Sequence, residues 1–362
     1  MVYSCARMAH RVFVGLSGGV DSAVSAALLK EQDYDVVGAF IKIWQPEFIE
    51  CTWREDRLDA MRVCAVLGIP FREIDLSEEY KKEVVERMVQ DYARGITPNP
   101  DVLCNLHIKF GAFAQWAKSE GAEKIATGHY ARKREVGGHV ELLRARDTSK
   151  DQSYFLYRLG QADLARALFP IGDKLKSDVR ALALKFRLPV ARKPDSQGLC
   201  FIGEVSMAEF LQRYIPVVPG PVVCDGKTIG EHEGAALYTV GQRHGFTFSR
   251  ETSAGPFYVV SVDTAANSVM VSPRRKDATR TTVNLSDMHW VYREPALPLT
   301  CNVQSRYHET PVGATISKDS AGFTSAFEHP HVASPGQSLV LYQKNEREGE
   351  GDVCVGGGII SL

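Results

Sequence analysis

The sequence has no long apolar run, no large excess of one charge and no paired cysteine motif, and each absence narrows the class of protein. No apolar stretch approaches the roughly 18 residues of a membrane-spanning helix, and residues 1–10 lack the apolar centre of a secretory signal. The formal net charge is −1 at pH 7, so composition alone does not indicate a nucleic-acid partner. We expect a cytoplasmic protein without a membrane partner.

The eight cysteines are spread along the chain without a C-x-x-C pair. This spacing fits neither a disulfide framework nor a zinc ribbon. In a reducing compartment most of them are expected to be free thiols, and any disulfide is expected to be transient and catalytic. Cys64 occupies an apolar position of a helical pattern, which predicts a core residue.

The first half of the chain alternates apolar runs with amphipathic helical patterns, and 362 residues exceed one ordinary core. Gly68 is placed to end one of these helices, and Ser77 is placed to cap the next. Such alternation predicts an α/β fold with a parallel sheet covered by helices on both faces. Strands are predicted at 11–16, 36–43, 71–75 and 124–127, and helices at 21–30, 55–68, 77–94 and 105–120.

From about residue 205 the sequence consists mainly of short β-rich runs separated by glycine and proline. From about 281 onward almost nothing has helical periodicity, which predicts a small barrel or sandwich, and we adopt the barrel. The predicted domains are an α/β domain at 1–205, a small β-rich central domain at 206–278 and a C-terminal β-barrel at 279–362.

The most specific local motif is SGGVDS at residues 17–22, directly after the first predicted strand. Its glycines allow a tight turn whose N–H groups can face a ligand, and the hydroxyl groups of Ser17 and Ser22 add donors. The following helix directs its positive end at the same place, which favours a bound phosphate. The loop is not a Walker A motif, because it lacks Gly-Lys-Ser/Thr.

This hexapeptide resembles the signature of the PP-loop ATP pyrophosphatases, which cleave ATP between the α and β phosphates and adenylate an oxygen. The resemblance implies an N-terminal domain like that of the adenine-nucleotide alpha-hydrolases. Asp21 would help to hold Mg²⁺ with the ATP, and no cluster of ligating residues predicts another metal. The implied ATP contacts are Gly15, Leu16, Ser17, Gly18, Gly19, Val20, Asp21, Ser22, Ile41 and Gly128.

Cys104 lies in the run NPDVLCN at residues 99–105. The prolines in and before this run are expected to keep it irregular, and Asn105 is expected to cap the helix that follows. A helix N-terminus stabilises a thiolate, which favours a lowered pKa at Cys104. Asp101 is three residues away and within reach of a neighbouring proton.

Cys200 lies in a second loop, DSQGLCFIG at residues 195–203, at the first predicted domain boundary. With both cysteine segments and the phosphate loop, the chain resembles the tRNA-specific 2-thiouridylase family over essentially its whole length. The strings that carry the resemblance are residues 17–22, 97–105 (TPNPDVLCN), 108–111 (IKFG), 127–130 (TGHY), 150–156 (KDQSYFL), 193–203, 238–245 (YTVGQRHG) and 356–359.

The resemblance implies that ATP adenylates the C2 oxygen of the wobble uridine and that a persulfide on Cys200 supplies the sulfur. Cys104 would either release sulfide by forming a disulfide with Cys200 or attack the activated base, and Asp101 would act as general acid and base. The implied partners are the tRNA anticodon loop and a persulfide donor, which is a cysteine desulfurase or a sulfur relay carrier. The implied tRNA contacts are Asn99, Pro100, Asp101, Lys150, Asp151, Gln152, Arg306 and Tyr307.

Two other functions are compatible with the phosphate loop. A PP-loop synthetase that adenylates a small-molecule carbonyl or carboxylate needs the loop but not the two cysteines. A non-catalytic RNA-binding protein with a relic nucleotide site needs neither, and the intact motifs argue against it.

Overall fold

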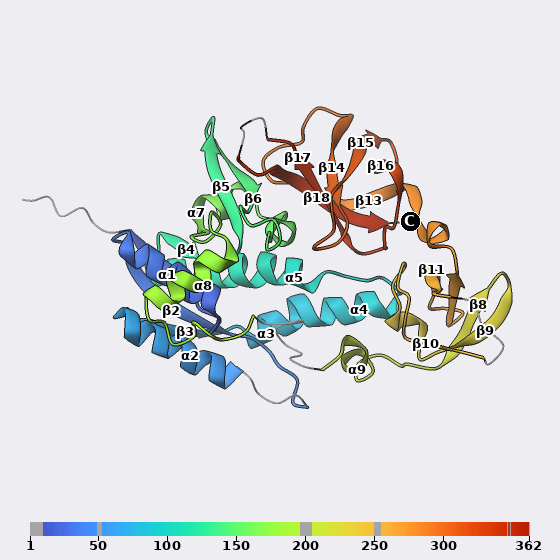
Figure 1. The fold of residues 1–362 in the computed structure, drawn as a ribbon, viewed down its shortest axis with the longest axis horizontal. Helices are drawn as coiled ribbons and strands as arrows, with labels where there is room; N and C mark the ends of the chain where they lie inside the picture. Colours follow the sequence, from blue (N-terminus) through green and yellow to red (C-terminus); the bar gives the residue numbers. More distant parts are fainter. Residues whose placement is uncertain are drawn as a thin grey trace, which may run out of the picture.

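The structure is a computed structural model that describes residues 10–48, 53–195, 205–249, 255–345, 347 and 349–361. Its strands form a five-stranded parallel sheet, a second five-stranded sheet and an eight-stranded sheet, in that order along most of the chain (Figure 1). Within the described ranges, no helix is both long and apolar enough to cross a membrane.

The parallel sheet has the strand order β3-β2-β1-β4-β7. Its central strand β1 alternates its side chains between two cores, as the two-residue period of a strand requires. Val12 and Val14 pack with α1, α2 and α8 on one face, whereas Phe13 packs on the other face with the helices that carry Met88 and Phe113. The predicted α/β fold with helices on both faces is therefore confirmed. The strands are β1 (Arg11–Gly15), β2 (Asp35–Lys42), β3 (Phe71–Asp75), β4 (Lys124–Ala126) and β7 (Ala167–Leu168).

The helices of this part largely follow the predicted ranges. Gly68 follows α2 with a φ of +59°, a left-handed conformation that suits glycine at a helix C-terminus. The prediction that Ser77 caps the third helix was wrong: Ser77 is the first helical residue, and its N–H donates to Asp75 Oδ1 at 3.0 Å. The elements are α1 (Val20–Glu31), α2 (Trp53–Leu67), α3 (Ser77–Tyr80), η1 (Lys81–Glu86), α4 (Arg87–Ala93), η3 (Ser153–Leu156), α7 (Gln161–Arg166) and α8 (Lys176–Lys185).

The second sheet has the order β10-β9-β8-β12-β11 and a small core of its own that includes Val222, Val259 and Val271. Its elements are β8 (Gly220–Cys224), β9 (Lys227–His232), β10 (Phe246–Phe248), β11 (Tyr258–Asp263), β12 (Ser268–Ser272), η4 (Ala235–Leu237) and η5 (Arg275–Ala278), with α9 (Met207–Leu211) before them. This confirms the predicted small β-rich central part.

The third sheet contains a closed six-stranded barrel, because β13 pairs with both β16 and β18. The predicted C-terminal barrel is therefore confirmed. The strands are β13 (Arg280–Trp290), β14 (Leu299–Gln304), β15 (Val312–Asp319), β16 (Gly322–His331), β17 (Ser338–Gln343) and β18 (Val353–Ser361).

A hairpin from the first half of the chain extends the barrel sheet. β6 (His139–Arg144) pairs with β5 (Ala131–Val136) and also with the start of β18, where Leu142 lies opposite Cys354. β18 changes partner near Gly356, whose φ of +149° is a conformation that L side chains rarely adopt. The hairpin therefore connects the nucleotide-binding half to the barrel by backbone hydrogen bonds.

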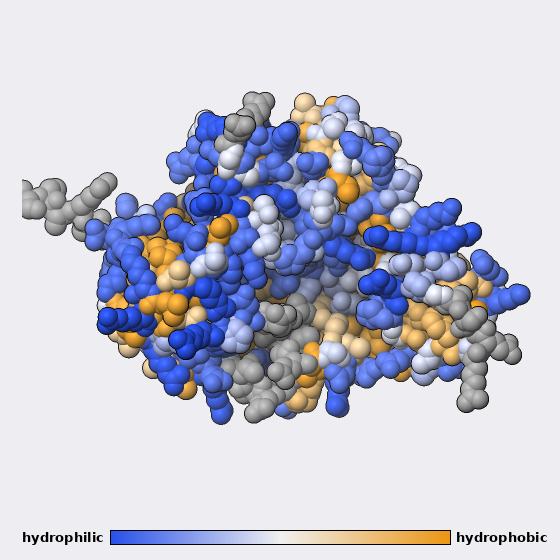
Figure 2. All heavy atoms as spheres, viewed as in Figure 1, coloured by the Kyte–Doolittle hydropathy of each residue, from blue (hydrophilic) through white to orange (hydrophobic). Residues whose placement is uncertain are grey.

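The surface of one face is mostly hydrophilic, with apolar patches over the α1–α8 region and near the central sheet (Figure 2). Large exposed apolar side chains occur in both of these regions, including Leu184 on α8 and Met270 on β12, which are 57% and 50% exposed. Scattered residues of this kind are normal for a folded chain.

Candidate functional site

The predicted nucleotide residues meet at one edge of the parallel sheet. The chain leaves β1 toward β2 on one side, whereas β4 lies on the other side of β1, so the strand order reverses between β1 and β4. Ligands of open α/β sheets bind at the carboxyl edge of such a reversal. Gly15 ends β1, Gly128 follows β4, and Ile41 lies near the end of β2, so the strand order places all of them at this edge.

The phosphate loop is a tight turn whose hydroxyl groups support its own backbone. Ser17 N–H donates to Ser22 Oγ at 3.2 Å, and Ser22 Oγ–H donates to the Gly19 carbonyl at 3.2 Å. Gly18 has a φ of +73°, and a Cβ there would lie 2.6 Å from the Asp56 carbonyl oxygen. The loop therefore requires glycine at this position and presents the N-terminus of the 12-residue helix α1.

Gly128 allows the segment after β4 to touch the start of α1. A Cβ at Gly128 would lie 2.7 Å from Ser22 N and 2.9 Å from the Asp21 carbonyl carbon. Ser25 Oγ–H donates across the same contact to the Thr127 carbonyl at 3.4 Å. The two loops that would hold a nucleotide are thus in backbone contact, with no room for a side chain between them.

Asp21 is at the centre of a charged network in this contact region. Its carboxylate accepts hydrogen bonds from Lys176 Nζ, at 2.8 Å to both oxygens, and from the Tyr130 hydroxyl at 3.0 Å. Burial, followed by the Asp21 charge, raises the pKa of Tyr130, so this phenol stays a donor. Lys176 is the first residue of α8 and was not predicted, because no sequence pattern connects residues 155 positions apart.

Lys176 also connects Asp21 to Asp195. Its Nζ lies 2.9 Å from Asp195 Oδ1, and the same carboxylate contacts Arg180 at 2.5 Å and Lys150 at 3.2 Å. Burial alone would raise the pKa of Asp195, but the hydrogen bonds from Lys176 and Lys150 lower it to about 2. Asp195 is therefore an anion at neutral pH, five positions before Cys200 in the sequence.

Asp21 was also the residue predicted to hold Mg²⁺. Both of its oxygens already contact the Lys176 ammonium group, so a cation could bind there only by displacing Lys176. Among the described residues, no group of three or more His, Cys, Asp or Glu side chains could hold a metal ion. The described residues therefore do not form a metal site by themselves.

Cys104 lies in the first turns of a longer helix than the sequence predicted. The helix runs through α5 (Pro100–Leu103), η2 (Cys104–Ala112) and α6 (Phe113–Ser119). Pro100 occupies its first position, where a missing N–H costs nothing, and Asn99 Oδ1 accepts from Val102 N–H at 3.3 Å. The expectation of an irregular segment capped by Asn105 was therefore wrong, because the proline favours the start of the helix.

The surroundings of Cys104 are apolar. Its side chain is 8% exposed, and the helix widens from α to π geometry at this residue, a change that often occurs at functional sites. Burial raises the pKa of Asp101, and the Lys109 charge opposes this shift. A carboxyl group of raised pKa can carry a proton closer to neutral pH, as a general acid must.

The Cys104 helix packs against the nucleotide edge of the sheet. A Cβ at Gly15 would lie 3.7 Å from the Phe113 ring, and the Phe110 and His129 rings are 6.0 Å apart. Cys104 and Phe113 are nine positions apart, which corresponds to about 14 Å along an α-helix. Cys200 lies outside the described residues, so the predicted approach of the two sulfur atoms stays a prediction.

Among the predicted tRNA contacts, Asp151 and Gln152 make hydrogen bonds within the protein. Asp151 is buried and accepts from Ala145 N–H at 2.9 Å and from the Ser153 hydroxyl at 2.9 Å. Gln152 Oε1 accepts from Tyr130 N–H at 2.9 Å. Asp151 therefore stabilises the loop that carries Lys150 and Gln152. Contact of these three residues with RNA stays a prediction.

Arg306 and Tyr307, which are also predicted tRNA contacts, lie in the barrel domain. Arg306 donates to the Val240 carbonyl at 2.7 Å and to Ser334 Oγ at 2.8 Å. The Tyr307 ring lies 4.5 Å from the Phe155 ring. Burial raises the pKa of Tyr307 to about 12, with smaller contributions from the Asp151 and Asp101 charges. Tyr307 is thus half-buried near Asp101, and its role in RNA binding also stays a prediction.

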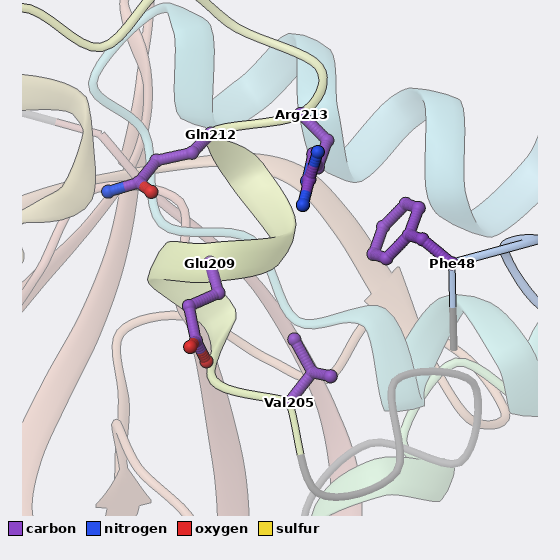
Figure 3. Close-up of a pocket in the computed structure, with 5 residues that line it drawn as sticks. All are labelled: Phe48, Val205, Glu209, Gln212 and Arg213. Carbon is purple, nitrogen blue, oxygen red and sulfur yellow. The ribbon is translucent and has the colours of Figure 1, made fainter. Parts of the chain in front are cut away.

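A separate pocket of about 420 Å³ lies between the chain after β2 and helix α9 (Figure 3). It is lined by Phe48, Val205, Glu209, Gln212 and Arg213, and the Arg213 guanidinium group lies 5.3 Å from the Phe48 ring centre. None of these five residues was predicted to belong to the site.

The fold and the site define an α/β nucleotide-binding chain with two additional β domains. Three family models match in this order: a tRNA methyl transferase HUP domain at residues 10–204, a tRNA methyl transferase PRC-barrel domain at 208–273 and an aminomethyltransferase beta-barrel domain at 280–360. The tRNA-specific 2-thiouridylase MnmA of Ralstonia pickettii is 46% identical over 97% of this chain and 96% of that protein.

The protein of the same name from Proteus mirabilis is 45% identical over 97% of this chain and 96% of that protein. The chain therefore belongs to the tRNA-specific 2-thiouridylase family. Among solved structures, it is similar to the U34-tRNA thiolase NcsA from Methanococcus maripaludis with its [4Fe-4S] cluster. That similarity has a TM-score of 0.36 and 19% identity, over 53% of this chain and 62% of that one, and the family assignment does not depend on it.

Proposed function

We propose that this protein is an ATP-dependent tRNA 2-thiouridylase that replaces the C2 oxygen of the wobble uridine with sulfur. The observation that carries the proposal is the packing of the Cys104 helix against Gly15 and His129, which flank the phosphate loop and Gly128, in a chain that belongs to the thiouridylase family. A phosphate loop alone would suit any adenylating enzyme. A helix that carries a cysteine and packs beside this loop suits sulfur transfer.

The phosphate loop supports the first step. The uracil C2 oxygen is a poor leaving group, and transfer of AMP from ATP to this oxygen, with loss of pyrophosphate, makes it a good one. The N–H groups at the start of α1 and the hydroxyl groups of Ser17 and Ser22 would bind the phosphates. Lys176 would add a positive charge at the same edge, where negative charge develops on pyrophosphate.

The two cysteines support the second step. In one route, the Cys104 thiolate attacks the sulfur of Cys200 that is bonded to the persulfide sulfur. A Cys104–Cys200 disulfide forms and hydrosulfide leaves, and this hydrosulfide displaces AMP from C2. In the other route, the Cys104 thiolate attacks C2 and AMP leaves. The terminal persulfide sulfur on Cys200 then displaces the Cys104 thiolate from C2, and this thiolate cleaves the S–S bond by attacking the Cys200 sulfur. Both routes end with the same disulfide, which a thiol reductant must reduce, and Asp101 is suited to donate or accept the proton.

The tRNA and the sulfur donor complete the proposed reaction. An anticodon loop presents unpaired bases, so extruding one costs only about a few kcal/mol. Asn99, Pro100 and Asp101 would contact the target base. Lys150, Asp151 and Gln152 would lie against the RNA near it, and Arg306 and Tyr307 would contact the anticodon from the barrel. A cysteine desulfurase or a sulfur relay carrier would load Cys200, and Mg²⁺ would arrive with ATP.

The test is thiolation of tRNA in vitro with ATP and a persulfide donor. We expect Cys104→Ala and Cys200→Ala each to lose thiolation to background while ATP binding stays within about twofold of wild type. Cys224→Ala is the matched control, because this half-exposed thiol on β8 lies in the central sheet, and it should keep full activity. Full activity in either of the first two variants would refute the proposal.

The same assay separates thiolation from other reactions. Replacing oxygen by sulfur and adding a methyl group change the nucleoside mass by different amounts, so mass spectrometry of digested tRNA distinguishes a thiouridylase from a methyltransferase. A small-molecule synthetase would release pyrophosphate without tRNA. We expect pyrophosphate release that depends on tRNA, at a fixed and stated salt concentration.

A further inference from the structure

The phosphate loop makes another close backbone contact, with the start of α2. A Cβ at Gly18 would lie 2.6 Å from the Asp56 carbonyl oxygen and 2.7 Å from Asp56 Cα, so no side chain fits between the two segments. α1, α2 and α8 cover the same face of the parallel sheet (Figure 1), and Asp56 lies in the first turn of α2. The shape of the phosphate loop therefore depends on where α2 begins.

Apolar packing is concentrated in the later turns of α2. The first fully buried residue of this helix is Ala60, and Leu58 before it is 46% exposed. The earlier turns are held largely by polar contacts. Arg57 pairs with Glu73 of β3 at 2.6 Å, and two acidic residues on another face of the helix share one lysine. These contacts supply much of what holds the turn that touches Gly18.

That lysine is Lys193, which joins the start of α2 to the segment after α8. Its Nζ donates to Asp56 Oδ1 at 2.8 Å and to Asp59 Oδ2 at 2.7 Å, and these carboxylates lie three positions apart on one helix face. The backbone of Lys193 is itself fixed. Its N–H donates to the Val190 carbonyl at 3.0 Å, and its carbonyl accepts from Arg180 of α8 at 2.5 Å. The ammonium group is therefore held from the α8 side and connects it to α2.

The charge balance beside the phosphate loop depends on the same ammonium group. Asp59 also pairs with Arg62 at 2.9 Å, whereas in the described part of the chain Lys193 is the only cation that pairs with Asp56. Without Lys193, an unpaired carboxylate would belong to the residue whose backbone touches Gly18. Because like charges repel, this carboxylate would oppose the binding of phosphates at the loop.

We propose that Lys193 is a positioning residue for ATP, which holds the start of α2 against the phosphate loop and neutralises the acidic residues beside it. This inference rests on the proposed function. Lys193 acts through Asp56 and Asp59 and does not need to touch the nucleotide. It is seven positions before Cys200 in the sequence, so the support of the ATP site and the proposed persulfide residue belong to one short stretch of chain.

The experiment measures binding of a non-hydrolysable ATP analogue to the full-length protein by calorimetric titration. Lys193→Met keeps the approximate length of the side chain without its charge, and Lys193→Arg keeps the charge and its donors. Lys185→Met is the matched control, because Lys185 also pairs with a carboxylate, at 3.3 Å, but its partner Glu31 is the last residue of α1, at the far end from the phosphate loop. We expect the Kd to rise roughly tenfold in Lys193→Met and about threefold or less in Lys193→Arg, with Lys185→Met like wild type.

Further readouts distinguish positioning from a general loss of stability. The KM for ATP in thiolation should rise as the Kd does, while kcat at saturating ATP and the KM for tRNA stay within about twofold of wild type. Hydrogen exchange at the amides of the first turns of α2 should become faster in Lys193→Met, while the amides of α1 stay protected. Adding Asp56→Asn to Lys193→Met should recover part of the affinity, because it removes the unpaired carboxylate.

Two results would overturn the inference: a Kd for Lys193→Met within about twofold of wild type, or a loss of affinity that Lys193→Arg shares in full. If Lys193→Met does not fold, Lys193→Gln, which keeps a polar side chain without the charge, carries the test with the same expectation. Failure of the wild-type protein to bind the analogue would instead overturn the proposed function.

Discussion

The substitution Gly128→Ala tests whether the backbone contact between the two nucleotide loops is required for ATP binding. The added Cβ would lie 2.7 Å from Ser22 N, 2.9 Å from the Asp21 carbonyl carbon and 3.1 Å from Asp21 Cβ. Real Cβ contacts are almost never shorter than 3.0 Å. Two of the three neighbours are backbone atoms at the start of α1, so the loops must separate by several tenths of an ångström.

The cost of this separation can be bounded. Overpacking of one methyl group typically costs about 1–3 kcal/mol. The same movement stretches the hydrogen bonds from Ser25 to Thr127 and from Tyr130 to Asp21, which are 3.4 and 3.0 Å long. If this free energy destabilises the loop conformation that binds ATP, the Kd for ATP rises by a factor of about 5–150.

The assay is calorimetric titration with a non-hydrolysable ATP analogue, combined with thermal unfolding of each variant. Gly160→Ala is the control, because among the described residues a Cβ there would meet one atom within 4 Å, an Asp163 carboxylate oxygen at 3.8 Å. It should bind ATP like wild type. If Gly128→Ala binds the analogue within about twofold of wild type and unfolds at the same temperature, the close contact is not what shapes the site.

Three further predictions concern charge and packing around the site. Lys176 and Lys150 lower the pKa of Asp195 to about 2. The ionised Asp195 therefore stabilises the folded protein fully above the unfolded-state pKa near 3.9, and this contribution disappears as the pH falls toward 2. Asp195→Asn should lower the free energy of urea unfolding by about 1–2 kcal/mol at pH 7 and not at all near pH 2, and a difference that does not change with pH would contradict this. Burial raises the pKa of the Cys64 thiol to about 11, so iodoacetamide at pH 8 should leave it unmodified in the native protein, and rapid labelling seen by mass spectrometry would disprove this. A Cβ at Gly38 would overlap Cys64 Sγ, so Gly38→Ala should lower the unfolding free energy by about 1–3 kcal/mol. The double variant Gly38→Ala/Cys64→Ala should recover part of this loss. Equal stability of the single and double variants would argue against the overlap.

The sequence predicted what depends on local pattern. Strand β1 and the glycines of residues 17–22 identify the phosphate loop because a buried strand, a tight turn and a helix must follow one another at that spacing. The parallel sheet, the β-rich central part and the C-terminal barrel follow from the same periodicities and are confirmed. Cys64 is buried in the core, as predicted.

The sequence did not predict contacts between distant positions. Lys176 pairs with Asp21 although neither lies in a pattern with the other, and the hairpin of β5 and β6 joins the barrel across more than 200 residues. The start of the Cys104 helix was placed five residues late because Pro100 was interpreted as a helix breaker, whereas at the first position it favours the helix. The boundaries near 205 and 278, and the pairing of Cys104 with Cys200, stay predictions.

The switch of partners along β18 has a consequence for any attempt to divide this protein. Residues 353–354 complete the edge of a hairpin that belongs to the nucleotide-binding half, and residues 356–361 close the barrel. A fragment ending near residue 205 would expose the outer edge of β6, and an exposed strand edge promotes association with other chains. A truncated catalytic fragment should therefore be less soluble than the whole chain, and restoring β18 as a separate peptide should reverse that loss.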